Sequence, residues 1–156
     1  MANLIEPLEF LKEIHKAGVR YLLIGRQAVI AYGGPVQSMD YDIYIDGGEK
    51  NTELLMGTAK KFNLSPTVPL GKMKSHFKFR LENNFALDVF RAKFLASGKG
   101  KKISFDEVYE RRETLKGETG LVINVPSIDD LIELKKLRSL PKDLEDIKYL
   151  EALKEK

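Results

Sequence analysis

The chain has 156 residues, of which 31% are charged, and a formal net charge of +3 at pH 7. This length suits one domain with a proper hydrophobic core, and the mildly basic balance is too small for a dedicated nucleic-acid-binding protein. The lack of cysteine excludes a disulfide framework and a thiolate zinc site, so a hard cation held by Asp oxygens is the remaining metal option. With no signal-peptide pattern and no apolar run of about 18 residues, we expect a cytoplasmic protein with no membrane association.

The first part of the chain predicts a helix, a buried strand and a second, shorter helix. Apolar residues recur at helical spacing over residues 4–14, which is typical of an amphipathic packing helix. The apolar run over residues 19–24 predicts a buried strand that ends at Gly25, and residues 27–32 predict a short helix. Gly25 would let the backbone approach a ligand closely, and the helix after it would offer N–H groups to a phosphate.

Two carboxylates lie in the next predicted strand, which covers residues 40–46. Asp40 and Asp42 are spaced by two, so their side chains point to the same face of that strand, about 7 Å apart. Carboxylates this close repel each other, and a divalent cation would offset the repulsion. The alternative is that both are ordinary solvated strand residues. We expect the opposite face, which carries Ile43 and Ile45, to be the core.

A third carboxylate follows a predicted helix over residues 49–62 and a loop over residues 63–75. Residues 76–81 and 85–90 alternate in polarity on either side of a turn, which predicts a β-hairpin. Asp88 lies within the second of these strands, where burial without a partner would be expensive. That cost places Asp88 beside the metal, unless it faces water on a half-exposed sheet.

The remaining chain predicts a basic loop, a second hairpin and two helices. Residues 97–102 have the composition of a flexible basic loop, and residues 113–115 and 121–125 predict the hairpin. Ser127 begins a helix with a pattern like a capping box, and Pro141 opens the last helix.

The order of strand, glycine, short helix and Asp-x-Asp resembles the nucleotidyltransferase superfamily of DNA polymerase β type. It is most similar to small single-domain members, the minimal and abortive-infection toxin nucleotidyltransferases. The residues that carry the resemblance are Gly25, Asp40, Asp42 and Asp88.

The resemblance implies an α/β (α+β) fold, with a mixed sheet of about five strands flanked by helices. Residues 1–126 would form the nucleotidyltransferase-like core. Residues 127–156 would form a C-terminal helical hairpin packed on the same domain.

The activity that the resemblance implies is transfer of a nucleoside monophosphate from a nucleoside triphosphate, such as ATP, to an acceptor hydroxyl. Asp40, Asp42 and Asp88 would be both the catalytic residues and the metal ligands, for two Mg²⁺ ions or for Mn²⁺. The acceptor stays open between RNA, a protein side chain and a small molecule.

The nucleotide-binding residues that the resemblance implies are Gly25, Arg26, Ser38, Lys135 and Lys142. The family has Gly or Ser where this chain has Arg26, and a long cation there could clamp the phosphates, block them, pair with a neighbouring Asp or turn to solvent.

Two more stretches depart from the family pattern or match it in part. Val36 stands where small family members have Arg, and Ser38 replaces their Thr. Lys135, Lys142, Asp143 and Asp146 match charges that face the cleft on the family's C-terminal helices, with Arg138 as a possible substitute for a missing Arg. The alternative is that these charges pair with one another across the helical hairpin.

Two other functions compete with the enzyme. Arg26 and Val36 favour a nucleotide- or RNA-binding module that has lost turnover. Small family members also occur in toxin–antitoxin systems, which implies an antitoxin-like protein partner, and a homo-oligomer is possible as well. Lys72 and Lys74 precede the hairpin, as lysines do in the abortive-infection members, and are weak candidates for the site.

Overall fold

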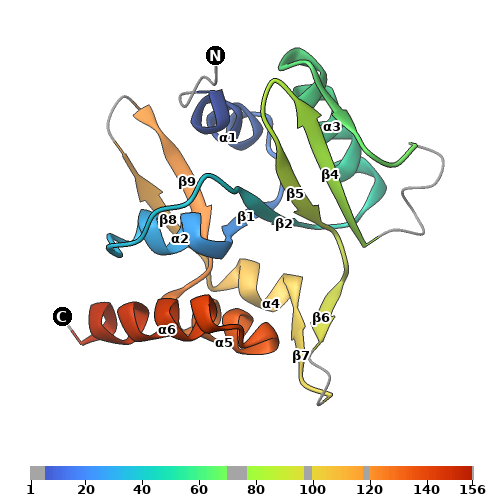
Figure 1. Cartoon of the computed structure of the whole chain (residues 1–156). Helices are drawn as coiled ribbons and strands as arrows, with labels where there is room; N and C mark the ends of the chain where they lie inside the picture. The colour runs from blue at the N-terminus through green and yellow to red at the C-terminus, as the bar shows by residue number, and fades with distance from the viewer. Residues whose placement is uncertain (1–5, 70–76, 97–99, 118–119, 156) are drawn as a thin grey trace.

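A mixed β-sheet forms the centre of the molecule. The computed structural model describes residues 6–69, 77–96, 100–117 and 120–155. In the main sheet, five strands lie in the order β1 (Tyr21–Ile24), β2 (Asp42–Ile45), β5 (Leu87–Phe90), β4 (Lys78–Asn83) and β3 (Leu64–Pro66). The central pair, β2 and β5, is parallel and the other neighbouring pairs are antiparallel, so the predicted mixed sheet is confirmed (Figure 1).

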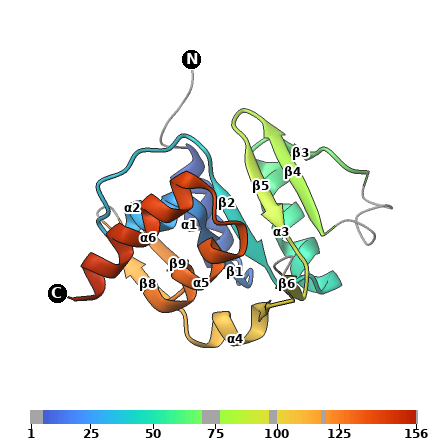
Figure 2. The ribbon, with the colours of Figure 1, turned by 60° about the horizontal axis from the view of Figure 1, so that its bottom comes forward.

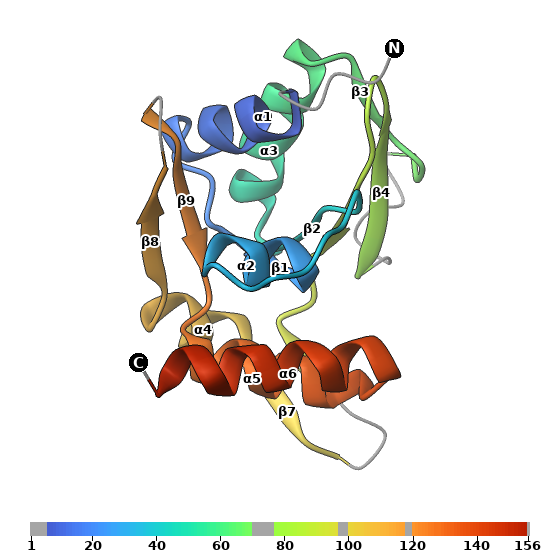
Figure 3. The ribbon, with the colours of Figure 1, turned by 60° about the vertical axis from the view of Figure 1, so that its left-hand side comes forward.

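One face of this sheet carries the main hydrophobic core. Helices α1 (Glu6–Lys16) and α3 (Glu49–Lys61) contact each other, and their apolar sides lie in the same core cluster as the strands (Figure 3). Ile43 and Ile45 are fully buried there, as the alternation along this strand predicts.

The other face of β2 is also covered, which the sequence did not indicate. Tyr44 lies on the face of Asp42 but is fully buried in a second, smaller core with Leu22, Ile24, Phe105 and Val108. Its ring meets Phe105 edge-on at a centroid distance of 5.0 Å. Phe105 belongs to α4 (Phe105–Glu110), about sixty residues further along the chain, so alternation within one strand could not reveal this cover.

Several predicted elements have different bounds in the structure. Strand β2 begins at Asp42, so Asp40 lies before the strand and not in it. Part of the expected loop over residues 63–75 is strand β3, because it pairs with β4 at the sheet edge. Lys72 and Lys74 lie outside the described residues.

Two hairpins form small sheets of their own. Strands β6 (Phe94–Ala96) and β7 (Lys102–Ser104) were not predicted, and β7 includes Lys102, the last residue of the expected basic loop. Strands β8 (Glu113–Lys116) and β9 (Val122–Val125) form the predicted second hairpin.

The chain ends in the predicted pair of helices, α5 (Ile128–Arg138) and α6 (Pro141–Lys154), which pack side by side (Figure 2). The Oγ of Ser127 accepts a hydrogen bond from the backbone N–H of Asp130 at 3.1 Å, which confirms the expected helix cap. Helix α6 also contacts α2 (Gly25–Ala31), the helix that follows Gly25. The division at residue 126 stays a prediction. None of the described helices has the length and apolar character needed to cross a bilayer.

Candidate active site

Two of the three predicted carboxylates lie side by side where β2 and β5 begin. Asp42 and Asp88 are directly opposite each other in the parallel register of these strands. The pairing is fixed by the backbone, since the N–H of Asp88 donates to the carbonyl of Tyr41 at 2.9 Å. The β-sheet thus brings together two residues 46 positions apart in the sequence.

Gly25 lies directly against the carboxylate of Asp42. Its φ is +71°, and a Cβ at this position would lie 2.5 Å from Oδ2 of Asp42. A side chain here would be strained by the backbone conformation and would also displace the carboxylate. The close approach predicted at Gly25 therefore occurs in the structure, and the group that lies against this glycine is the carboxylate of Asp42.

The carboxylates affect one another's ionisation. Burial, together with a smaller effect of the negative charges of Asp88 and Asp40, raises the pKa of Asp42 to about 6, while Lys78 and Arg138 act in the opposite direction. The charge of Asp40 therefore affects the pKa of Asp42, although the side chain of Asp40 is exposed. This cluster of negative charge in a partly buried setting is the kind of environment that a bound cation stabilises.

Ser38 shapes the turn that carries Asp40. Its Oγ accepts a hydrogen bond from the backbone N–H of Asp40 at 3.1 Å. The carbonyl of Ser38 accepts from the amide of Gln27 at 2.7 Å, which ties the turn to α2. The hydroxyl predicted to meet a phosphate is thus engaged with the Asp40 backbone.

A cavity of about 700 Å³ opens beside Asp42 and Gly25. One part of its wall is polar and charged: Lys78, Lys135, Arg138 and Asp143. The larger part is apolar: Ile24, Phe77, Phe90, Ala92, Phe94, Leu95, Leu131, Leu134 and Leu137. The size is within the range of small-molecule sites, and the sequence did not reveal the apolar wall because it is built from β1, the β4–β6 region and α5.

Arg26 does not enter the carboxylate cluster. Its Nε donates to Oδ1 of Asp146 at 3.2 Å, and its Nη2 donates to Oε1 of Glu145 at 3.0 Å. Both carboxylates belong to α6, which lies beside α2. Of the alternatives left open by the sequence, pairing with Asp40 or Asp42 is therefore wrong for this structure.

The C-terminal charges pair largely with one another. Nζ of Lys135 donates to Oδ2 of Asp146 at 2.8 Å, and both side chains are buried. Arg138 forms a bidentate ion pair with Asp143, in which Nε donates to Oδ2 at 2.9 Å and Nη2 donates to Oδ1 at 3.0 Å. Pairing across the hairpin is confirmed for Lys135 and Asp146, although Lys135 and Arg138 still line the cavity.

Lys142 is exposed on α6 and is absent from the residues that line the cavity. Its predicted contact with a nucleotide stays a prediction.

The donor chemistry at Asp42 and Asp88 fits a hard cation such as Mg²⁺. In this structure Oδ1 of Asp88 accepts from Nε of Arg80 at 3.2 Å, so Arg80 partly neutralises it. Within the described ranges, no three or more His, Cys, Asp or Glu side chains are grouped closely enough to hold a metal ion. A site with three carboxylates would therefore require Asp88 to exchange Arg80 for the ion.

Comparison with solved structures shows that the chain has the fold of nucleotidyltransferases, which confirms the fold that the resemblance implies. Among solved structures, the chain is similar to the lincosamide antibiotic adenylyltransferase LnuA bound to lincomycin. The TM-score is 0.64 at 18% identity, over 95% of this chain and 96% of that chain.

Two further structures share the fold. The TM1012 protein of Thermotoga maritima gives a TM-score of 0.61 at 16% identity, over 96% of this chain and 91% of that one. The antibiotic-resistance factor ANT(2'')-Ia gives 0.56 at 13% identity, over 95% and 84%. No family model and no curated protein matches the sequence. At these identities the likeness establishes the fold, and the toxin-like subtype stays a prediction.

Proposed function

We propose that this protein is a metal-dependent nucleotidyltransferase that transfers a nucleoside monophosphate from a nucleoside triphosphate to an acceptor hydroxyl. The observation that carries the proposal is the pair Asp42 and Asp88, set opposite each other in the sheet, with Asp42 against Gly25 and in the wall of a cavity. Two adjoining, partly buried carboxylates cost free energy, and a bound cation would offset that cost.

The residues around the pair suit the parts of such a reaction. Asp42 and Asp88 would hold Mg²⁺, with Asp40 completing the set. When bound, the metal would stabilise charge on the attacking and leaving oxygens. Lys78 and Arg138 line the same cavity and would offset the charge of the phosphates. Asp88 would also accept the proton of the acceptor hydroxyl.

A small molecule is the acceptor that the cavity favours over RNA or a protein side chain. Most of the lining is apolar, which suits the body of a small organic molecule better than a charged polynucleotide. The neighbouring structures point the same way, since LnuA was solved with lincomycin and ANT(2'')-Ia with adenylyl-2''-tobramycin.

A nucleotide-binding module without turnover is the second candidate. Two observations favour it: Arg80 holds Asp88, and the described residues contain no three-group metal site. The predicted antitoxin-like partner, the homo-oligomer and the cytoplasmic location stay predictions.

The first experiment is a calorimetric titration of ATP, GTP, CTP and UTP in the presence of Mg²⁺. It compares the wild type with Asp42→Asn and Asp88→Asn, and uses Glu53→Gln, an exposed carboxylate on α3, as the control. We expect one nucleotide to bind only with Mg²⁺, at least about tenfold more weakly in both Asp variants, and with full affinity in the control.

Turnover separates the two candidates. Pyrophosphate release on adding small alcohols or aminoglycoside-like and lincosamide-like acceptors would support the transferase. Binding without release for any acceptor would support the module. If none of the four nucleotides binds, both candidates are wrong.

A further inference from the structure

The apolar wall of the large cavity beside Asp42 is backed by the second, smaller core of the molecule. Phe90, Leu95 and Leu134 pack against that core and also line the cavity. Ile24 belongs to the core itself and lines the cavity as well. Because the core holds these side chains in place, a ligand would meet a preformed apolar surface, and binding would require little ordering of the wall.

Two phenylalanine rings extend this wall toward solvent. Phe77 is 65% exposed and Phe94 is 47% exposed, and both line the cavity. A large apolar ring in contact with water gains free energy when another apolar group covers it. The exposed part of the lining therefore suits a ligand with a flat apolar body.

The carboxylates of the lining are already committed. Among the described residues, Asp42 and Asp143 are the acidic groups that line the cavity. The side chain of Asp143 is 3% exposed and is held by Arg138, and Asp42 is the metal ligand of the proposed reaction. An amino group on a ligand would therefore find no available carboxylate in this wall, and burying it unpaired would be costly.

Ammonium groups of the chain lie near the aromatic rings of the wall. Nζ of Lys78 is 5.3 Å from the centroid of Phe90. Nζ of Lys93 and Nζ of Lys102 are 5.8 and 5.9 Å from the centroid of Phe94. A cationic ligand on these rings would be repelled by like charges, whereas an uncharged ligand would not.

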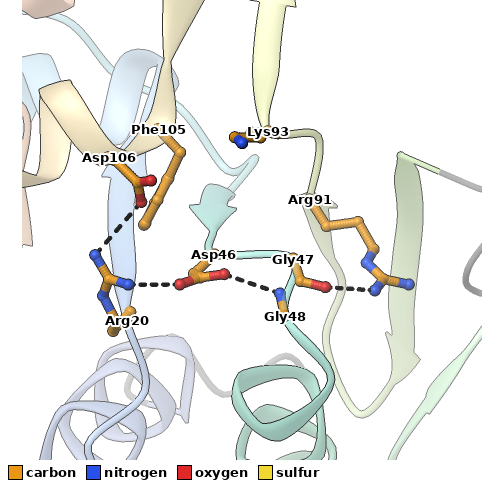
Figure 4. Close-up of a pocket in the computed structure, with 8 residues that line it drawn as sticks. All are labelled: Arg20, Asp46, Gly47, Gly48, Arg91, Lys93, Phe105 and Asp106. Atoms are coloured by element: carbon orange, nitrogen blue, oxygen red, sulfur yellow. Dashed lines mark hydrogen bonds and ion pairs between the residues drawn. The ribbon is translucent and has the colours of Figure 1, made fainter.

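A smaller cavity, of about 360 Å³, has the opposite character (Figure 4). There Arg20 lies between two carboxylates, with Nη1 2.6 Å from Oδ2 of Asp46 and Nη2 3.5 Å from Oδ1 of Asp106. Oδ1 of Asp46 accepts from the backbone N–H of Gly48 at 2.8 Å. These charges have partners within the chain, whereas the wall beside Asp42 presents apolar side chains that a ligand can cover.

We propose that the cavity beside Asp42 binds an uncharged alcohol with an aromatic body as its acceptor and excludes acceptors that carry amino groups. This inference rests on the proposed function, because it names the acceptor of that reaction. The hydroxyl oxygen bonds to the α-phosphorus of the nucleotide, and the bond from that phosphorus to the bridging oxygen breaks. Pyrophosphate leaves, and the hydroxyl proton goes to Asp88.

Binding is tested first, without nucleotide or Mg²⁺. The full-length chain is labelled at the methyl groups of Leu and Ile and titrated with biphenyl-4-ylmethanol, with its 4′-aminomethyl derivative, which is cationic at pH 7, and with tobramycin. We expect the alcohol to cause saturating ¹H–¹³C shifts of Ile24, Leu95, Leu134 and Leu137, which line the cavity, and none of Leu55, which lies in the main core. Both amines should bind at least about tenfold more weakly.

Three variants make the result specific. Leu137→Glu adds a carboxylate to the lining, so it should weaken binding of the alcohol about tenfold and strengthen binding of its aminomethyl derivative. Leu144→Glu adds the same charge at an exposed position of α6 outside the lining and should change neither. Phe94→Ala, which removes a largely exposed ring, should weaken binding of the alcohol about three- to tenfold.

The inference is overturned if the lining methyl groups do not shift, or if the amines bind as tightly as the alcohol. It is overturned equally if a nucleoside triphosphate with Mg²⁺ shifts Leu134 and Leu137 and displaces the alcohol, since the wall then holds the base of the nucleotide. Binding of the alcohol that persists beside the nucleotide supports the inference.

Pyrophosphate release separates this inference from the proposed function. Release with the alcohol and not with the amines supports both. Release with tobramycin and not with the alcohol supports the transferase and overturns the inference. If the alcohol binds at the lining residues but no acceptor gives release, the ligand class of the cavity is upheld and the transferase is wrong.

Discussion

Asp42 and Asp88 occupy opposite positions in the parallel strand pair at the centre of the main sheet, β2 and β5. The carboxylate of Asp42 lies so close to Gly25 that no side chain fits between them. Because three segments of the chain meet at this point, a change in any one of them should alter the chemistry of Asp42.

The ionisation of Asp42 should make stability depend on pH. Its pKa is raised from 3.8 to about 6 in the folded chain, so the folded state holds this proton more tightly than the unfolded state. Stability should therefore be lost as pH rises from about 4 to about 6, by about 2 kcal/mol in the absence of divalent cations. Below pH 4 the carboxyl group of Asp42 is protonated in both the folded and the unfolded state, so its ionisation no longer changes the free energy of unfolding.

Urea unfolding at pH 4 and pH 7 checks this prediction, with Asp42→Asn beside the wild type. The free energy of unfolding of Asp42→Asn, relative to that of the wild type, should rise by about 2 kcal/mol from pH 4 to pH 7. The reason is that the variant has no buried carboxyl group to deprotonate. The free energy of unfolding of Glu53→Gln should change between pH 4 and pH 7 as that of the wild type does. A constant difference between wild type and Asp42→Asn at both pH values would contradict the raised pKa.

Gly25→Ala should displace Asp42. The new methyl group would lie 2.5 Å from Oδ2, and the carboxylate would have to rotate away. We expect a loss of about 1 kcal/mol from the positive φ and, in addition, loss of Mg²⁺-dependent nucleotide binding. Gly18→Ala is the matched control, since its φ is +82° with no atom within 4 Å of the added Cβ. It should lose similar stability and keep nucleotide binding.

Arg26→Ser tests whether this arginine clamps a nucleotide. Because Arg26 is held by Asp146 and Glu145, we expect a loss of about 1–2 kcal/mol of stability and less than a threefold change in nucleotide affinity. Glu145→Gln removes only the more exposed contact and should cost about 0.5 kcal/mol or less. A drop of about tenfold or more in affinity for Arg26→Ser would instead favour a phosphate clamp. Chemical denaturation and calorimetry measure the two effects separately.

Asp146 should be the most sensitive charge of the helical hairpin. It is fully buried between Lys135 and Arg26, and Lys135 is only 6% exposed. Asp146→Ala would leave a buried ammonium without its partner, at a cost of about 3–5 kcal/mol.

The double variant Lys135→Met/Asp146→Leu removes both charges and should recover part of this loss. Unfolding of the wild type, Lys135→Met, Asp146→Leu and the double variant gives the coupling energy between Lys135 and Asp146. A coupling near zero would mean that the pair contributes nothing to holding α5 on α6.

Arg80 should compete with a metal ion for Asp88. The pair is partly exposed, with side-chain exposures of 44% and 24%, so its contribution is small. Arg80→Gln should therefore raise the affinity for Mg²⁺ about two- to threefold. Calorimetric titration with MgCl₂ measures the change, and Lys61→Gln, an exposed lysine of α3, is the control. Weaker Mg²⁺ binding in Arg80→Gln would mean that Arg80 orients Asp88 for the ion.

Much of the fold could be predicted because its signals are local. The spacing of apolar residues gave the helices and most strands, and the alternation over residues 85–90 placed Leu87 and Val89 in the core with Asp88 on the other face. The edge strand β3 and the small sheet of β6 and β7 were missed. Each of these strands has three residues and depends on a partner strand for its conformation.

The candidate site was predictable in part for the same reason. The buried strand, the glycine at its end and the carboxylates of the next strands are visible in the sequence, and in the structure that glycine, Gly25, has a φ of +71°. The ends of the strands could not be predicted to the residue, and Asp40 lies before the strand that was expected to carry it.

What the sequence determined by itself was the kind of most elements and, within them, the face on which a side chain lies. Only the tertiary structure decided which charges meet. Arg26 binds Asp146, which lies 120 residues away, and Tyr44 is covered by Phe105 from α4. The physical reason is that periodicity depends on neighbours within one turn or one strand, whereas the partner of a charge depends on how distant segments pack.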